Sequence, residues 1–159
     1  MKLLVKPLNA VDFAPYGDVI SIPAAAGRTY FEQSLGNRRP AARPSLSTVM
    51  KPPMTTTAAV PVELLERHEF SSQTFIPLDD VCWLIVVCPH RPEGGPDVQK
   101  AVAFIANGQQ GITYRPDTWH HGLTVLSGAG KFAVFMWRDG TSGDEEFVKV
   151  PPFEVDIAL

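Results

Sequence analysis

The sequence predicts an all-β domain, folded as a sandwich or a barrel of antiparallel strands. Its 15 prolines and 12 glycines are scattered between short apolar or alternating runs, which is typical of strands joined by turns. These runs recur at intervals of roughly 8 to 15 residues, as the strands of small sandwiches and barrels do. The fold class follows from this pattern alone.

The candidate strands follow one another along most of the chain, and each is a short apolar or alternating run bounded by turn residues. In order they are Lys2–Lys6, Gly17–Ile22, Leu46–Met50, Ala59–Phe70, Gln73–Leu78, Val81–Cys88, Ala101–Ala106, Gly111–Arg115, His121–Leu126, Lys131–Arg138 and Glu146–Val150. A short helical turn is expected after Asn9, whose side chain can cap it, with Asp12 near the positive end of its dipole. Ala24–Pro44 lacks periodicity, and we interpret it as a long loop.

Length and composition restrict the class of protein. At 159 residues the chain is expected to be one domain spanning residues 1–159. A net charge of -3 and a pI near 5.8 give no basic surface for nucleic acid. The longest apolar run, Val81–Cys88, is far shorter than the roughly 20 residues that cross a bilayer. The N-terminus has no signal-peptide pattern, so a cytoplasmic protein with no nucleic-acid or membrane partner is expected.

The two cysteines are expected to be free. Cys82 and Cys88 lie in one predicted strand, about 20 Å apart at roughly 3.3 Å per residue, which is too far for a disulfide.

Two segments carry the residue types of a small-acid site or a metal site. Glu66 and His68 are two apart on a strand, so they share a face while Arg67 points the other way. Gln73 follows the expected turn at Ser71-Ser72, from where it can face them across a hairpin. The acidic run Asp144-Glu145-Glu146 is instead interpreted as a solvated turn, since adjacent acids repel.

The second segment is GITYRPDTWHHG, Gly111–Gly122, which ends a strand at a proline turn and then presents two adjacent histidines. Consecutive strand residues point to opposite faces, so one histidine should point inward. We assign His120 to the inner face and His121 to the outer face or a dimer contact. A slip of one residue would exchange the two.

Four blocks resemble the ureidoglycolate lyase family: NAVDFAPYGDVI, ELLERHEFSSQTFIPL, AFIANGQQGITYRPDTWHH and WRDGTSGDEEFV. The resemblance implies a cupin-type antiparallel β-barrel (a double-stranded β-helix) with a few short helical turns, in a homodimer. It also implies that the protein cleaves ureidoglycolate to glyoxylate and urea, late in allantoin breakdown. The chain departs from the family pattern within Arg28–Pro44, at Arg115 and at Trp137, which leaves a different small acid open as substrate.

The expected reaction needs one base, one acid and a group that holds a carboxylate. His68, His120 and Glu66 are the candidates for proton transfer. Arg115 or Lys131 is expected to hold the carboxylate.

Gln73, Tyr114 and His121 are further candidates for substrate contact. No organic cofactor is expected.

A metal is left open. Glu66, His68, Gln73 and His120 offer two imidazoles, one carboxylate and an amide, which can form a facial site for nickel, manganese, iron or zinc. The family resemblance implies nickel first. Two other functions also remain open: a non-catalytic cupin that binds a small carboxylate, and a metal oxygenase or sugar isomerase on the same fold.

Overall fold

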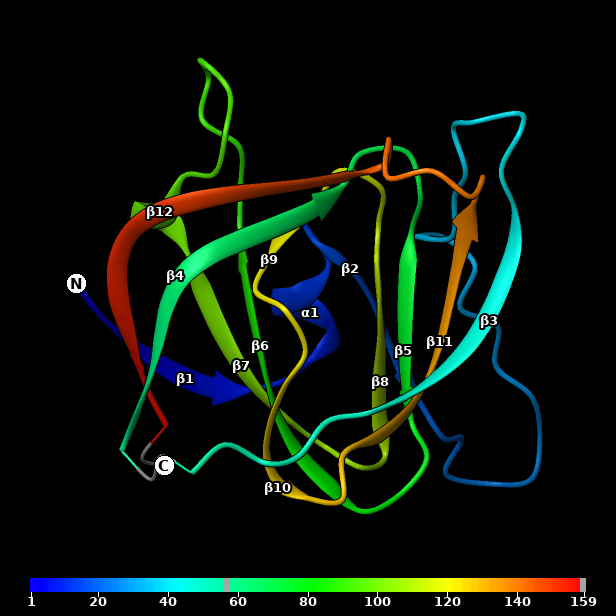
Figure 1. Ribbon diagram of the computed structural model, residues 1–159. Coiled ribbons are helices and arrows are strands. Elements are labelled where there is room, and N and C mark those ends of the chain that lie inside the picture. Colours follow the sequence, from blue (N-terminus) through cyan, green and yellow to red (C-terminus); the bar gives the residue numbers. More distant parts are fainter. Residues whose placement is uncertain (56–57, 158–159) are drawn as a thin grey trace.

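The computed structural model describes residues 1–55 and 58–157, which form two β-sheets, one helix and one 3-10 turn (Figure 1). In chain order the elements are β1 (Lys2–Pro7), α1 (Ala10–Phe13), β2 (Gly17–Ser21), β3 (Arg43–Met50), β4 (Ala59–His68), β5 (Gln73–Pro77), β6 (Val81–Cys88), η1 (Val98–Lys100), β7 (Val102–Asn107), β8 (Gln110–Tyr114), β9 (Trp119–His120), β10 (Thr124–Gly128), β11 (Lys131–Arg138) and β12 (Glu145–Asp156). The all-β prediction is confirmed.

The larger sheet closes on itself. Its strand order is β10-β6-β7-β1-β12-β4-β9, and β9 also pairs with β6. The strands β6, β7, β1, β12, β4 and β9 therefore make a closed barrel, and closure removes the exposed edges that an open sheet would present. β1 runs parallel to both β7 and β12. The barrel is therefore not wholly antiparallel, whereas the sequence had suggested antiparallel strands.

The second sheet has five strands in the order β2-β8-β5-β11-β3. In Figure 1 its strands β8, β5, β11 and β3 stand together on the right, while β4 and β12 run side by side toward their upper ends. This arrangement brings the end of β4 and the start of β12 close to the second sheet. The whole is a cupin-like fold, a closed barrel with an additional sheet.

β6 separates two apolar cores. Trp83, Ile85 and Val87 belong to the first core, between the two sheets, whereas Leu84 and Val86 belong to the second, inside the closed barrel. A strand that is buried on both faces needs apolar residues at every position. This explains why Val81–Cys88 is the longest apolar run in the chain.

Several element boundaries differ from the prediction. The predicted strand His121–Leu126 is wrong as one element, because the chain leaves the sheet at residues 121–123 between β9 and β10. β12 continues past Val150 to Asp156, because a register shift between Lys149 and Phe153 takes up the two prolines. β3 begins at Arg43, so the end of the expected loop belongs to a strand.

The Asn9 cap is confirmed, since its side chain accepts a hydrogen bond of 2.9 Å from the Asp12 backbone N–H. Both cysteines are free, as expected. Burial raises the pKa of the Cys88 thiol to about 12, so it stays a neutral, inert thiol. Within residues 1–55 and 58–157, no helix is long and apolar enough to cross a membrane.

Candidate functional site

Glu66 and His120 are directly opposed on β4 and β9. Directly opposed residues of an antiparallel pair share one face of the sheet. Here the register brings Nε2 of His120 to 3.3 Å from Oε1 of Glu66. His120 is buried, with 1% of its surface exposed. The result is a half-buried carboxylate in contact with a buried imidazole.

The second ring nitrogen of His120 indicates where its hydrogen lies. Nδ1 is 2.8 Å from the backbone carbonyl oxygen of Thr118. A carbonyl oxygen can only accept, so Nδ1 must carry a hydrogen. In a neutral ring Nε2 would then turn its lone pair toward the Glu66 carboxylate, which is repulsive. This geometry allows the two residues to share a proton between Nε2 and Oε1.

The charge state of Glu66 agrees with this arrangement. Burial would raise the pKa of Glu66, but its contact with His120 and the nearby His68 and His121 lower the pKa overall. Glu66 is thus a carboxylate at neutral pH.

His120 and not His121 is turned toward the first core. Its ring stacks on Tyr114 with the ring centres 4.1 Å apart and the planes 18° from parallel. The preceding Trp119 lies in the second core. His121 is half-buried, with Nδ1 3.3 Å from the carbonyl oxygen of Leu64, and burial lowers its pKa. The two histidines therefore alternate as expected, with His120 and not His121 turned toward the first core.

His68 ends β4 beside the same pair. It is 5% exposed, and its ring centre lies 6.0 Å from that of His120. Burial and the neighbouring His120 lower the pKa of His68. His68 is consequently neutral near pH 7 and has a free lone pair with which to accept a proton.

Arg67, between Glu66 and His68, points to the opposite side. Its guanidinium pairs with Asp117 and with Glu146, and it lies 4.9 Å from the centre of the Trp119 ring. Arg67 therefore stabilises the junction of β4, β9 and β12 and does not face the two catalytic candidates.

Gln73 and Tyr114 line the same region from the second sheet. Gln73 on β5 is opposite Tyr114 on β8 and Met136 on β11. Burial, together with the charge of Glu66, raises the pKa of Tyr114, so it remains a neutral phenol. The structure thus brings together Glu66, His68, Gln73, Tyr114 and His120, although their segments are well separated in the sequence.

Asp144 corrects the interpretation of the acidic run as a solvated turn. It is 4% exposed, and its Oδ1 accepts hydrogen bonds from the backbone N–H groups of Phe70 at 2.7 Å and Ser71 at 3.2 Å. Its Oδ2 lies 3.6 Å from Nδ1 of His68 and 3.4 Å from Nη2 of Arg39. The cost of burying this carboxylate is offset by backbone donors and a guanidinium.

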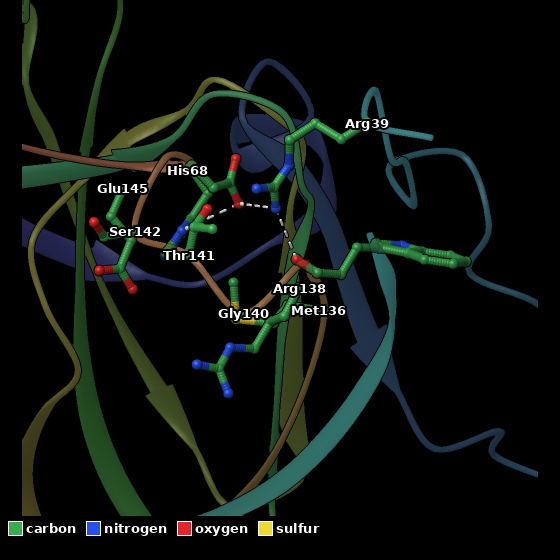
Figure 2. Close-up of a pocket in the computed structure, with 10 residues that line it drawn as sticks. Arg39, His68, Met136, Arg138, Gly140, Thr141, Ser142 and Glu145 are labelled. Carbon is green, nitrogen blue, oxygen red and sulfur yellow. Dashed lines mark hydrogen bonds and ion pairs between the residues drawn. The ribbon is translucent and has the colours of Figure 1, made fainter. Parts of the chain in front are cut away.

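A cavity of about 240 Å³ opens on this side of His68 (Figure 2). Its lining residues are Arg39, His68, Met136, Trp137, Arg138, Gly140, Thr141, Ser142, Asp144 and Glu145. In Figure 2, dashed lines join His68 and Arg39 through an unlabelled carboxylate, which the two ion pairs identify as that of Asp144, and the Arg138 side chain lies beside the same space. Glu66 and His120 do not line the cavity. His68 does, and it therefore lies between the cavity and the buried pair of Glu66 and His120.

Arg138 is the cation of the cavity that is free to bind a ligand. Arg39 already pairs with Asp139 and Asp144. Arg138 is exposed and forms no ion pair with any residue in the described part of the chain. A free guanidinium next to His68 can bind a carboxylate in a bidentate manner.

The two cations expected from the sequence lie elsewhere. Arg115 follows Tyr114 and therefore points away from the first core, where Nη2 donates to the carbonyl oxygen of Ala14 at 2.6 Å. Lys131 is at the opposite end of β11 from Arg138, about 23 Å away at roughly 3.3 Å per residue. Neither lines the cavity beside His68.

The residues expected to bind a metal do not fit a resident ion. Across residues 1–55 and 58–157, no group of three or more His, Cys, Asp or Glu side chains is arranged to hold one. Among the four expected ligands, Gln73 offers only a neutral amide. We therefore derive no step of the reaction through a metal.

Six buried polar atoms in this region lack a hydrogen-bond partner among the described residues. They are Nε of Arg39, Nδ1 of His68, Oε1 of Gln73, Nε2 of His120, Nε1 of Trp137 and Oδ2 of Asp144. An unpaired buried donor or acceptor costs about 1–3 kcal/mol, and such atoms gathered at one place are typical of a site that binds a polar ligand.

Sequence reasoning missed Arg39, Arg138 and Asp144. Arg39 and Asp144 lie far apart in the sequence, in segments without periodicity, so no local pattern connects them. A usable signal existed for Arg138 alone, because it ends a core strand that runs beside the strand of Gln73.

Comparison with known proteins identifies the family. The family model for ureidoglycolate lyase matches residues 1–156. A protein of Agrobacterium fabrum is 38% identical over 154 residues, covering 96% of this chain and 94% of that protein. The ureidoglycolate lyase of Burkholderia mallei is 36% identical and covers 99% of this chain and 95% of its own. That of Schizosaccharomyces pombe is 37% identical and covers 64% of this chain and 56% of its own. The chain belongs to the ureidoglycolate lyase family.

Proposed function

We propose that the protein is a lyase that cleaves ureidoglycolate to glyoxylate and urea. The observation that carries this proposal is a pair of buried imidazoles with their ring centres 6.0 Å apart, one of them in contact with a carboxylate. His68 has a lowered pKa and serves as the base, whereas His120 with Glu66 serves as the acid. A site that only binds a small carboxylate does not need such a matched base and acid.

The reaction requires these two proton transfers. Ureidoglycolate has a hydroxyl group and a ureido nitrogen on the same carbon. His68 accepts the hydroxyl proton, the carbon–oxygen double bond forms, and the carbon–nitrogen bond breaks. The pair of His120 and Glu66 donates its proton to the departing nitrogen, which leaves as urea. General acid and base groups of this kind contribute roughly 10²- to 10⁴-fold each.

The two imidazoles are close enough to act on one small substrate. The ring centres of His68 and His120 are 6.0 Å apart. The proton taken up by His68 is afterwards exchanged back to His120, so that the site is restored.

Arg138 and Gln73 orient the substrate in this proposal. The Arg138 guanidinium, which lines the cavity beside His68, binds the carboxylate. The buried, unpaired Oε1 of Gln73 accepts a hydrogen bond from the urea group. Tyr114 supports the ring of His120 by stacking and makes no direct contact with substrate.

The deciding experiment is a glyoxylate assay. Purified protein is incubated with racemic ureidoglycolate, and glyoxylate is followed with a coupled reductase against a control without enzyme, because the substrate decays spontaneously. Glyoxylate release well above the control supports the proposal. Thermal stabilisation by glyoxylate without any turnover contradicts it and favours a binding protein.

We also propose a cytoplasmic homodimer. The outer face of the five-stranded sheet is apolar: Leu46 is 75% exposed, Ile76 is 42% exposed, and Phe135 lies opposite Leu46 in the ladder. β3, which carries Leu46, is also the edge strand of this sheet. An apolar face next to an unpaired edge favours association with a second copy.

A further inference from the structure

We propose that Asp144 is a positioning residue that determines which nitrogen of His68 accepts the substrate proton. This inference rests on the proposed function, since it concerns the base of that reaction. It assigns a role to an acidic residue that lies more than seventy positions from His68 in the sequence.

The two side chains face each other through unpaired atoms. Oδ2 of Asp144 and Nδ1 of His68 are 3.6 Å apart, and neither has a hydrogen-bond partner among the described residues. Both residues are at least 95% buried, with 4% and 5% of their surfaces exposed. Leaving two such atoms unpaired is costly, so a small rotation that joins them is favourable.

The carboxylate is held from three directions. Its Oδ1 accepts from the N–H groups of Phe70 and Ser71, directly after β4, and the Asp144 carbonyl oxygen accepts from Glu69 N–H at 3.1 Å. Arg39 approaches Oδ2 from the other side, at 3.4 Å (Figure 2). The carboxylate is consequently fixed relative to the backbone that carries His68.

A fixed carboxylate beside Nδ1 selects one tautomer. An ionised carboxylate accepts hydrogen bonds and cannot donate them, so Nδ1 of His68 carries the hydrogen. Nε2 is then left with the lone pair that takes the substrate proton. When the His68 ring becomes charged, the negative charges of Asp144, Glu66 and Glu145 stabilise it. His120 has the opposite effect and disfavours the charged ring.

The substitution Asp144→Asn isolates this role. The asparagine Oδ1 can still accept from Phe70 and Ser71, so the turn after β4 keeps its hydrogen bonds. The amide nitrogen replaces Oδ2 and presents a donor to Nδ1 of His68, which reverses the tautomer. We expect kcat to fall by about 10²- to 10⁴-fold, with KM changed only a few-fold.

Two readouts separate positioning from a structural role. The ¹⁵N shifts of the His68 imidazole should show hydrogen on Nδ1 in the native protein and on Nε2 in D144N. The acid limb of the kcat/KM profile should move to lower pH in D144N, because the carboxylate that favours the charged ring is gone. Asp139→Asn is the matched control: Asp139 pairs with Arg39 from the same loop but does not line the cavity.

The outcomes are distinct. Hydrogen on Nε2 of His68 in the native protein overturns the inference without any kinetic measurement. Native kcat in folded D144N overturns it as well. Absence of ureidoglycolate cleavage by the native protein overturns the proposed function, whereas the ¹⁵N assignment still decides the role of Asp144.

Discussion

Glu66 and His120 hold a carboxylate and an imidazole 3.3 Å apart because β4 and β9 pair in one register. A shift of β9 by one residue would put Trp119 or His121 opposite Glu66. The site therefore depends on the closure of the barrel, since β9 also pairs with β6 at Val87.

Replacing His120 by glutamine should lower kcat by about 10²- to 10⁴-fold, because glutamine cannot transfer a proton. KM should change less than kcat, since Arg138 and not His120 binds the carboxylate in the proposed reaction. The coupled glyoxylate assay measures both constants, and circular dichroism checks the fold. His90→Gln is the matched control, since His90 contacts Asp117 and Trp119 outside the site. An H120Q enzyme of near-native rate would remove His120 from the mechanism.

The pH profile of kcat/KM should reach its plateau at a lower pH than an ordinary histidine allows. Burial and His120 lower the pKa of His68 below its usual value of about 6.5, so the base becomes free at a lower pH than an ordinary histidine does. The measurement is kcat/KM between pH 4.5 and 8, corrected for spontaneous decay. An acid limb centred above pH 6.5 would contradict this assignment.

Stability should depend on pH through the same residue. In the unfolded chain His68 binds a proton below about pH 6.5, while in the folded protein it does so only at lower pH. Folding therefore gains stability as the pH rises through this window, by at most about 1.4 kcal/mol per pH unit. Urea unfolding at several pH values tests this, and His68→Gln should flatten the slope there.

Arg138 should control substrate affinity. Hydrogen bonds to charged groups contribute about 1.5–3 kcal/mol, so Arg138→Met should raise KM about 10- to 100-fold with a smaller effect on kcat. Arg91→Met, which removes an exposed arginine outside the cavity, is the control. An unchanged KM in R138M would show that another group holds the carboxylate.

The sequence predicted the fold and the centre of the site for a simple reason. Strand alternation alone placed Glu66 and His68 on one face and Arg67 on the other, and the same rule set His120 inward. These are local properties of an extended chain. The family resemblance then supplied the architecture in which the two segments meet.

The cationic and acidic parts of the site could not be predicted in this way. Arg115 was expected to hold the carboxylate, yet it follows Tyr114 on the strand, and this turns it away from the first core. Asp144 looked solvated because its neighbours are acidic, but the N–H groups after β4 bury it. Contacts between loops depend on how strands are connected in space, which residue patterns do not record.

Turnover should survive removal of divalent metals. The described residues offer no three-ligand group of His, Cys, Asp or Glu, and the proposed proton transfers need none. Protein treated with a chelator and then desalted should keep its kcat, and added nickel, manganese, iron or zinc should not increase it. Loss of activity that is restored by one of these metals would support the metal site expected from the sequence at Glu66, His68, Gln73 and His120.

The apolar outer face of the second sheet should determine the oligomeric state. Leu46 is 75% exposed and lies opposite Phe135, so Leu46→Glu places a charge at the centre of the proposed contact. A buried, unpaired charge should raise the dissociation constant tenfold or more, equal to about 1.4 kcal/mol. Light scattering over a range of protein concentrations measures this. Val11→Glu, at another exposed apolar residue on α1, is the control. A native protein that is monomeric at every concentration, or a dimer that L46E leaves intact, would place any association at another surface.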